Sequence, residues 1–124
     1  MTVKIIFMNN SKTKTLIACY PQAHYGVVGG HLNEGEEIID AALREAFEET
    51  GMRLLPDQLQ PYTFAKHRQG KIILMYTCLL AENIQLQAHD DVKDLLWVDV
   101  TDIANDKYPV NDYKIPILEF ANTN

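Results

Sequence analysis

The segment from Ile38 to Thr50 is the part of this sequence whose pattern most restricts the fold. On a wheel of about 100° per residue, Glu45, Glu48 and Glu49 cluster on one face. The opposite face, with Phe47 at its margin, gathers Ile39, Ala42, Leu43, Ala46 and Thr50. Gly51 follows and is a good residue for ending a helix. The pattern predicts one strong amphipathic helix that packs on the rest of the chain through a single face.

Short β-prone runs lie on both sides of this helix. A polar turn at 9–12 separates the first two runs and suggests a hairpin, and Gly29-Gly30 is expected to end the third. A helical turn is expected over Asp102–Asn105 and a terminal helix over Asn111–Phe120, which requires Pro116 to lie near its start. The strands are expected at Val3–Met8, Thr15–Cys19, Tyr25–Val28, Gln60–Lys66, Lys71–Leu80 and Leu95–Val100. This order indicates an α/β or α+β fold with a sheet sandwiched between helices.

Length and charge limit the domain organisation and the partners. The chain has 124 residues, of which 47% are hydrophobic, so we expect one domain over residues 1–124. Its formal net charge of -6 does not supply the basic surface that a nucleic acid polymer requires. We see no signal peptide pattern and no stretch near the roughly 20 apolar residues of a membrane span. A cytoplasmic monomer or homodimer, with no membrane partner and two buried thiols at Cys19 and Cys78, is therefore expected.

The three glutamates of the predicted helix point to a metal site. Glu45, Glu48 and Glu49 stand at i, i+3 and i+4, so their carboxylates project from one side and repel one another without a counter-ion. Mg²⁺ would remove that repulsion, and it commonly bridges protein carboxylates to substrate phosphates. A solvated acidic helix face is the alternative interpretation of these glutamates alone. The fixed spacing of Gly29-Gly30, Glu36 and Arg44 from them favours the metal site.

The stretch from Gly30 to Met52, GHLNEGEEIIDAALREAFEETGM, resembles the Nudix box, G-x5-E-x7-R-E-U-x-E-E-x-G-U. The fixed letters of that pattern are all present, at Gly30, Glu36, Arg44, Glu45, Glu48, Glu49 and Gly51. The resemblance implies the α/β/α sandwich of this family, with a mixed sheet. It also implies a hydrolase that acts on phosphorus-containing acid anhydrides with Mg²⁺ or Mn²⁺ as its cofactor.

The resemblance assigns roles to the residues of the box. The expected metal ligands, which include one backbone carbonyl, are Glu45, Glu48, Glu49 and either Gly29 or Gly30. The same glutamates and Arg44 are the expected catalytic residues, and Arg44 would orient a carboxylate through its planar fork. Glu36 would brace the loop against the helix, and Gly51 would end the helix. The general base varies within the family and has no assigned residue here.

Two departures from the family pattern lie before and after the box. Val28 stands where many relatives have proline before the double glycine, which affects loop stiffness more than chemistry. Relatives that act on nucleoside triphosphates often have an arginine at the end of the second strand, whereas this chain has Ala18-Cys19-Tyr20. A phosphate contact is therefore either missing or supplied by Lys66, His67 or Arg68.

Additional site residues are suggested by positions further along the chain. An acidic residue shortly before a tryptophan often adds a metal ligand or base in relatives, and Trp97 is preceded by Asp90, Asp91 and Asp94. Asn111 resembles a position at which MutT-like members contact a purine base. We nevertheless favour a helix N-cap for Asn111, since asparagine is a preferred cap residue.

The function implied by the resemblance is water attack on a phosphorus of a nucleoside diphosphate linked to a group X. A MutT-like nucleoside triphosphate pyrophosphohydrolase of the 8-oxo-dGTP type is the first choice, because the chain is minimal. ADP-sugar and dinucleoside polyphosphate hydrolases are the alternatives. A non-catalytic nucleotide-sensing Nudix module is the alternative of another class. It is disfavoured because such a module need not retain metal-binding glutamates, and this chain retains all of them.

Overall fold

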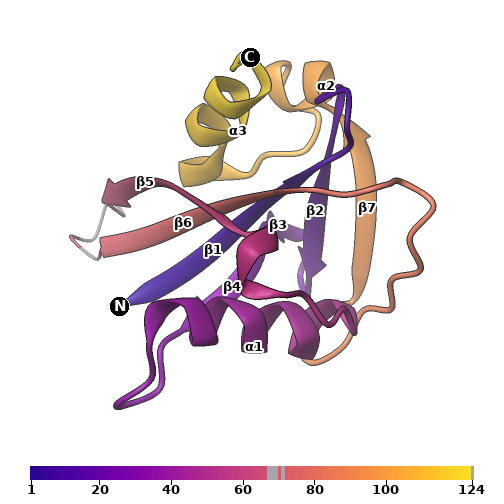
Figure 1. The fold of residues 1–124 in the computed structure, drawn as a ribbon. Coiled ribbons are helices and arrows are strands. Elements are labelled where there is room, and N and C mark those ends of the chain that lie inside the picture. Colours follow the sequence, from indigo (N-terminus) through magenta and orange to yellow (C-terminus); the bar gives the residue numbers. More distant parts are fainter. Residues whose placement is uncertain (67–69, 71, 124) are drawn as a thin grey trace.

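A mixed sheet with helices on both of its faces makes up the computed structural model of the chain (Figure 1). The structure describes residues 1–66, 70 and 72–123, and for 63–66 the backbone alone. Helix α1 (Ile38–Thr50) covers one face of the sheet. Helices α2 (Val100–Ala104) and α3 (Lys114–Ala121) cover the other. The expected α/β/α sandwich with a mixed sheet is confirmed.

Most strands lie within two residues of the predicted ranges. The strands are β1 (Thr2–Met8), β2 (Lys14–Tyr20), β3 (His24–Gly26), β4 (Val28–His31), β5 (Gln60–Lys66), β6 (Ile72–Leu79) and β7 (Asp94–Asp99). There are also two short 3-10 helices: η1 (Pro56–Gln58) lies between α1 and β5, and η2 (Asn111–Tyr113) directly precedes α3. The predicted turn at 9–12 joins β1 to β2, which pair antiparallel at Met8 and Thr15.

Strand β1 organises the sheet, because it has neighbours on both edges. It runs parallel to β6 over its full length. On its other edge it pairs antiparallel with β4, where Lys4 lies opposite Gly29. Strand β2 pairs antiparallel with β3 and with β7. The segment from β3 to β4 therefore leaves β2 and joins β1, and Val27 is the residue at which it crosses.

This crossing corrects the expectation of one strand over Tyr25–Val28 that ends at Gly29-Gly30. The structure has two strands instead, and the second continues through both glycines to His31. The physical reason is the partner strand. Gly29 and Gly30 continue the backbone hydrogen bonding because β1 lies beside them, and this long-range pairing has no local signal in the sequence.

The hydrophobic core is divided by the sheet into two layers. Side chains along a strand point alternately to its two faces. Val3, Ile5 and Phe7 pack in the layer beneath α1, whereas Ile6 and Met8 pack in the layer beneath α2 and α3. All five side chains are fully buried. Strand β1 is thus buried on both faces along most of its length, as expected for a central strand.

The ends of the helices agree only in part with the sequence. Gly51 ends α1 as predicted, with φ 76° and its N–H bonded to the carbonyl of Phe47. The N-cap prediction for Asn111 is wrong, because α3 begins at Lys114 with Tyr113 as its cap residue. Asn111 has φ 51° and begins η2, a short turn that precedes the helix, and no side-chain cap hydrogen bond forms there. Pro116 lies near the start of α3, where proline is tolerated.

Two further expectations concern the cysteines and the membrane. Cys78 is a buried free thiol, as expected. Cys19 is also free but only partly buried, so the prediction of two buried thiols is wrong for this residue. In the part of the chain that the structure describes, no helix is both long and apolar enough to cross a bilayer.

Candidate active site

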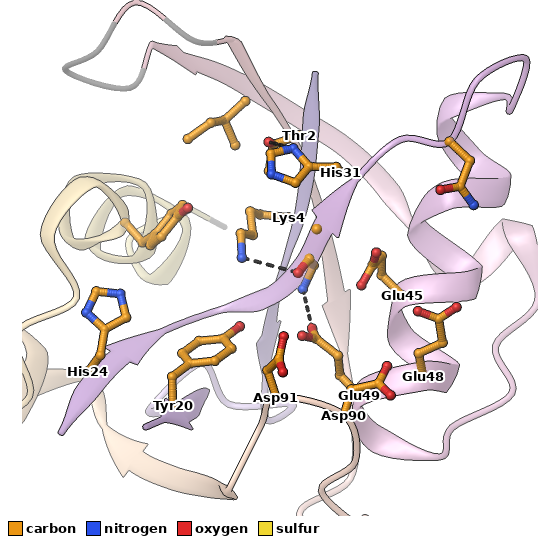
Figure 2. Close-up of a pocket in the computed structure, with 15 residues that line it drawn as sticks. Thr2, Lys4, Tyr20, His24, His31, Glu45, Glu48, Glu49, Asp90 and Asp91 are labelled. Carbon is orange, nitrogen blue, oxygen red and sulfur yellow. Dashed lines mark hydrogen bonds between the residues drawn. The ribbon is translucent and has the colours of Figure 1, made fainter. Parts of the chain in front are cut away.

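A cleft of about 770 Å³ lies where α1 faces the strands β1 and β4 (Figure 2). Five carboxylate side chains line it, three from α1 and two from the loop before β7. They are those of Glu45, Glu48, Glu49, Asp90 and Asp91. The backbone of Gly29 and Gly30 also lines the cleft. The structure therefore brings together all the glutamates and glycines that the sequence proposes as metal ligands.

Arg44 links the loop before α1 to the carboxylates of the helix. Its Nε and Nη2 donate to the two carboxylate oxygens of Glu36 at 2.8 and 3.0 Å. Its Nη1 donates to Glu45 Oε1 at 3.0 Å and to Glu48 Oε2 at 3.1 Å. The carbonyl of His31 accepts from Nη2 at 3.0 Å. The hydrogen bond to Glu36 is the largest cause that raises the pKa of Arg44 above its ordinary value, so the guanidinium is always charged. Arg44 therefore contacts the carboxylates of Glu36, Glu45 and Glu48 at the same time.

Glu36 connects the loop to the helix in the expected way. Its Oε1 accepts a hydrogen bond from the backbone N–H of Asn33 at 3.0 Å, while both oxygens accept from Arg44. The Arg44 hydrogen bond, followed by the Asn33 N–H, lowers the pKa of Glu36 below its ordinary value. Glu36 is therefore an ionised acceptor that holds the guanidinium in place.

The two glycines lie against neighbouring atoms, and Gly29 leaves no room for a side chain because the backbone of β1 is beside it. Gly29 has φ 143°, and a Cβ there would lie 2.1 Å from the carbonyl oxygen of Val3. A Cβ on Gly30 would lie 2.5 Å from Glu45 Oε1. Removing the side chain at both positions lets β4 pass between β1 and the acidic face of α1. The double glycine thus places backbone atoms within reach of the carboxylates.

Glu49 is buried, which corrects the prediction that all three glutamates lie on the face away from the core. Only 6% of this residue is exposed, and its Oε1 accepts the N–H of Gly29 at 2.7 Å (Figure 2). Burial raises the pKa of Glu49 to about 7, although the Gly29 N–H and the charge of Lys4 oppose this shift. The charges of Glu45 and Asp90 act in the same direction as burial. A carboxyl group with such a pKa, in a cleft, is a candidate functional group.

The candidates outside the box have different positions relative to the cleft. Asp91 and its neighbour Asp90 line it and face the glutamates of α1 (Figure 2). Asp94 is the first residue of β7 and accepts the N–H of Leu95; it does not line the cleft. Asn111 does not line it either, although Tyr113, two residues later, does.

Arg68 and His67 lie outside the described residues, and the side chain of Lys66 is not described.

The sequence did not predict the wall of the cleft that lies opposite the acidic face of α1. It consists of Lys4 from β1, Tyr20 from the end of β2 and Tyr113 from η2. The Nζ of Lys4 lies 5.9 and 5.7 Å from the ring centroids of Tyr20 and Tyr113. One sequence signal was present: the alternation of β1 puts Lys4 on the same side as Ile6 and Met8, where an apolar residue is expected.

Chemically, the acidic wall fits a hard divalent cation, which prefers carboxylate and carbonyl oxygens. In the described residues, however, no three His, Cys, Asp or Glu side chains stand close enough together to hold an ion. Arg44 holds Glu45 and Glu48, and Gly29 holds one oxygen of Glu49. The oxygen donors are thus present, but these side chains would have to move closer together to hold an ion.

The chain is similar in sequence to proteins of one known family. The family model described as "NUDIX domain" matches residues 1–118. Nucleoside triphosphatase NudI of Escherichia fergusonii is 29% identical over 99 residues, which cover 70% of this chain and 68% of the relative. NudI of Escherichia coli K12 is matched over 65% of its length. The chain therefore spans about two thirds of the length of these curated relatives.

Solved structures show the same fold. A Caenorhabditis elegans Ap4A hydrolase binary complex has a TM-score of 0.77 at 19% identity, over 98% of this chain and 96% of that one. The NUDIX domain of Shewanella oneidensis NrtR, complexed with ADP ribose, also has a TM-score of 0.77 at 19% identity, over 97% and 84% of the two chains. With the family match over residues 1–118, the chain belongs to the Nudix family of hydrolases, which act on phosphorus-containing acid anhydrides.

Proposed function

We propose that this protein hydrolyses the phosphoric anhydride bond of a nucleoside diphosphate linked to a group X, with Mg²⁺ or Mn²⁺ as cofactor. Nucleoside triphosphates are the first choice of substrate, with release of a nucleoside monophosphate and pyrophosphate. The observation that carries the proposal is the acidic wall itself. Glu45, Glu48 and Glu49 line one cleft, and Arg44 holds two of them in fixed positions.

Each residue of the acidic wall has a distinct task in this proposal. Glu45, Glu48 and Glu49, with the carbonyl of Gly29 or Gly30, would hold the divalent ion. When bound, that ion supplies Lewis-acid polarisation of the phosphate oxygens and lowers the pKa of the attacking water. Arg44 orients the carboxylates, since its fork contacts Glu45 and Glu48 at the same time.

The chemical step needs one acceptor for a proton. The water oxygen forms a bond to one phosphorus of the anhydride, and the bridging P–O bond breaks with its electron pair on the departing phosphate. The proton of the water passes to a carboxylate of the cleft. Asp90 and Asp91 line the cleft and are not among the proposed metal ligands, so they are the candidate proton acceptors.

Three substrate classes receive support from related proteins. The nucleoside triphosphatase NudI is the relative that favours a triphosphate. The Ap4A hydrolase and the ADP ribose complex have the same fold and keep dinucleoside polyphosphates and ADP-sugars as alternatives. A non-catalytic nucleotide-sensing module is the alternative from another class. The presence of every glutamate of the box favours the enzyme over this module.

The test is a hydrolysis screen of the purified chain with Mg²⁺, Mn²⁺ or a chelator. The panel contains ordinary and oxidised purine nucleoside triphosphates, ADP-sugars and dinucleoside polyphosphates, and the products are separated by chromatography. We expect hydrolysis of one class, dependent on the ion, with ¹⁸O from labelled water in one product phosphate. Binding of a panel member without hydrolysis of any would instead support the sensing module and contradict the proposal.

A further inference from the structure

Lys4 is a cation on the wall of the cleft, and no carboxylate of the described residues lies within ion-pair distance of it. Its Nζ donates to the carbonyls of Val27 at 3.1 Å and Gly29 at 3.3 Å, and no ion pair of Lys4 is found among the described residues. An ammonium group has three N–H donors, so one remains for another acceptor. Buried charges in proteins are usually paired. A partly buried, unpaired ammonium on the wall of a cleft is therefore placed for an anionic ligand.

In the protein without ligand, burial of the Lys4 ammonium costs part of its hydration free energy. It lowers the pKa of Lys4, while the charges of Glu49 and Glu45 oppose the shift and favour the ammonium form. The rings of Tyr20 and Tyr113, with centroids 5.9 and 5.7 Å from Nζ, compensate for part of the lost hydration. Among the described residues, Lys4 is also the only lysine or arginine that lines the cleft.

We propose that Lys4 contacts a phosphate oxygen of the substrate, on the opposite side of the cleft from the carboxylates of α1. This inference rests on the proposed function and adds a substrate-binding residue to it. The third N–H of Lys4 provides a hydrogen bond to one non-bridging oxygen, and its charge balances part of the negative charge of a diphosphate.

The location of Lys4 explains why its ammonium can reach the substrate. In Figure 2 the side chain extends from β1 toward the Gly29 carbonyl, while Glu45 and Glu49 lie on the other side of β4. A diphosphate seated over the Gly29 backbone would meet carboxylates on one side and the ammonium on the other. Metal ions held by the glutamates and the ammonium would then contact different oxygens of the same ligand.

A merely structural role is the competing explanation, because Lys4 also satisfies two backbone carbonyls. Val27 lies where the chain crosses from β2 to β1, and its carbonyl accepts from Tyr20 Oη at 3.2 Å as well as from Lys4. In that role, loss of the ammonium would disturb the Gly29 carbonyl and weaken binding of the metal and the phosphate together. If Lys4 contacts the phosphate, its positive charge strengthens phosphate binding and weakens metal binding, because it repels a nearby metal ion. Loss of the ammonium would then change the two affinities in opposite directions.

The experiment compares binding of two probes, Mn²⁺ alone and inorganic pyrophosphate in the presence of Mg²⁺, by calorimetry. For Lys4→Met we expect at least about tenfold weaker pyrophosphate binding, with Mn²⁺ affinity unchanged or higher. Lys12→Met is the matched control, because Lys12 also contacts an aromatic ring, Phe120, and a backbone carbonyl, Thr123, but lies outside the cleft. Lys12→Met should bind Mn²⁺ and pyrophosphate with wild-type affinity.

A second measurement does not depend on whether the variant folds. The ¹³Cε and ¹⁵Nζ signals of Lys4 in the wild-type protein should shift when pyrophosphate and Mg²⁺ are added, and those of Lys12 should not. Failure of the wild type to bind pyrophosphate, unchanged Lys4 signals, or a parallel loss of both probes in Lys4→Met would overturn the inference. Pyrophosphate binding through Lys4 without hydrolysis of any nucleotide would instead contradict the proposed function alone.

Discussion

The two walls of the cleft are built in different ways. The acidic wall comes mainly from one helix, in which Glu45, Glu48 and Glu49 lie within five consecutive residues. The opposite wall combines Lys4, Tyr20 and Tyr113, which belong to three elements far apart in the sequence. Helical periodicity is enough to bring the first set together, whereas the second set depends on how the sheet and η2 are placed. The half of the site that we propose binds metal is therefore local in sequence, and the half that we assign to substrate contact is not.

The largest expected effect tests whether the acidic wall carries the chemistry. Glu48→Gln should lower kcat by about 10³-fold, because an amide binds a divalent ion far less well than a carboxylate. The free energy of unfolding should change by less than about 0.5 kcal/mol, since the Glu48 side chain is 40% exposed and, among the described residues, pairs with Arg44 alone. Steady-state kinetics and urea unfolding measure the two quantities.

Asp40→Asn is the control on the same helix, because Asp40 is an exposed acid in the first turn of α1 and lies outside the cleft. It should turn over substrate like the wild type. A kcat near the wild-type value in Glu48→Gln would contradict the proposal that the acidic wall carries the chemistry.

A smaller effect is expected when the link between loop and helix is weakened. Arg44→Lys retains the charge but cannot contact Glu36, Glu45 and Glu48 at once, so Mn²⁺ affinity and kcat should fall by about 10- to 100-fold. Calorimetry with Mn²⁺ and steady-state kinetics check this. Arg53→Lys is the control, since Arg53 stacks on Phe47 at 4.2 Å and does not line the cleft. Equal affinities in the two variants would exclude an orienting role for Arg44.

The pH dependence of stability tests the burial of Glu49. Its pKa is raised from 4.5 to about 7 in the folded protein. Without metal, the stability contribution of the protonated group is fully present below pH 4.5 and is lost as pH rises through about 7. The loss should be about 3 kcal/mol, because each pKa unit corresponds to about 1.4 kcal/mol. Urea unfolding in a chelator should show that Glu49→Gln removes this decline, and parallel pH profiles for the two proteins would contradict it.

The smallest effect is expected on the opposite wall. Tyr20→Phe removes the hydroxyl that donates to the Val27 carbonyl at 3.2 Å, but Lys4 still donates to the same oxygen. The free energy of unfolding should fall by no more than about 1 kcal/mol, and Mn²⁺ affinity should not change. Tyr108→Phe is the control, because no hydrogen bond of its hydroxyl is found among the described residues. A reduced Mn²⁺ affinity in Tyr20→Phe would show that the two walls are coupled.

Much of the fold follows from patterns of short range. The limits of α1 and its end at Gly51 agree with the helical period and the glycine signal. The expected strands are present, but the separate strands β3 and β4 were not predicted, because only pairing with β1 carries the chain through Gly29 and Gly30. The N-cap prediction for Asn111 is wrong for a similar reason. Buried Val110 fixes the chain in the core under α3, and the helix begins only after a turn.

The box pattern and the acidic face of α1 follow from the sequence alone, because helical periodicity places residues three and four apart on one side of a helix. Tertiary packing buries Glu49 against Gly29, brings Asp90 and Asp91 to face the glutamates, and places Lys4 in the cleft. These relations join residues far apart in the chain, such as Lys4 and Gly29. Their contacts depend on strand pairing and packing between elements, which no local pattern encodes.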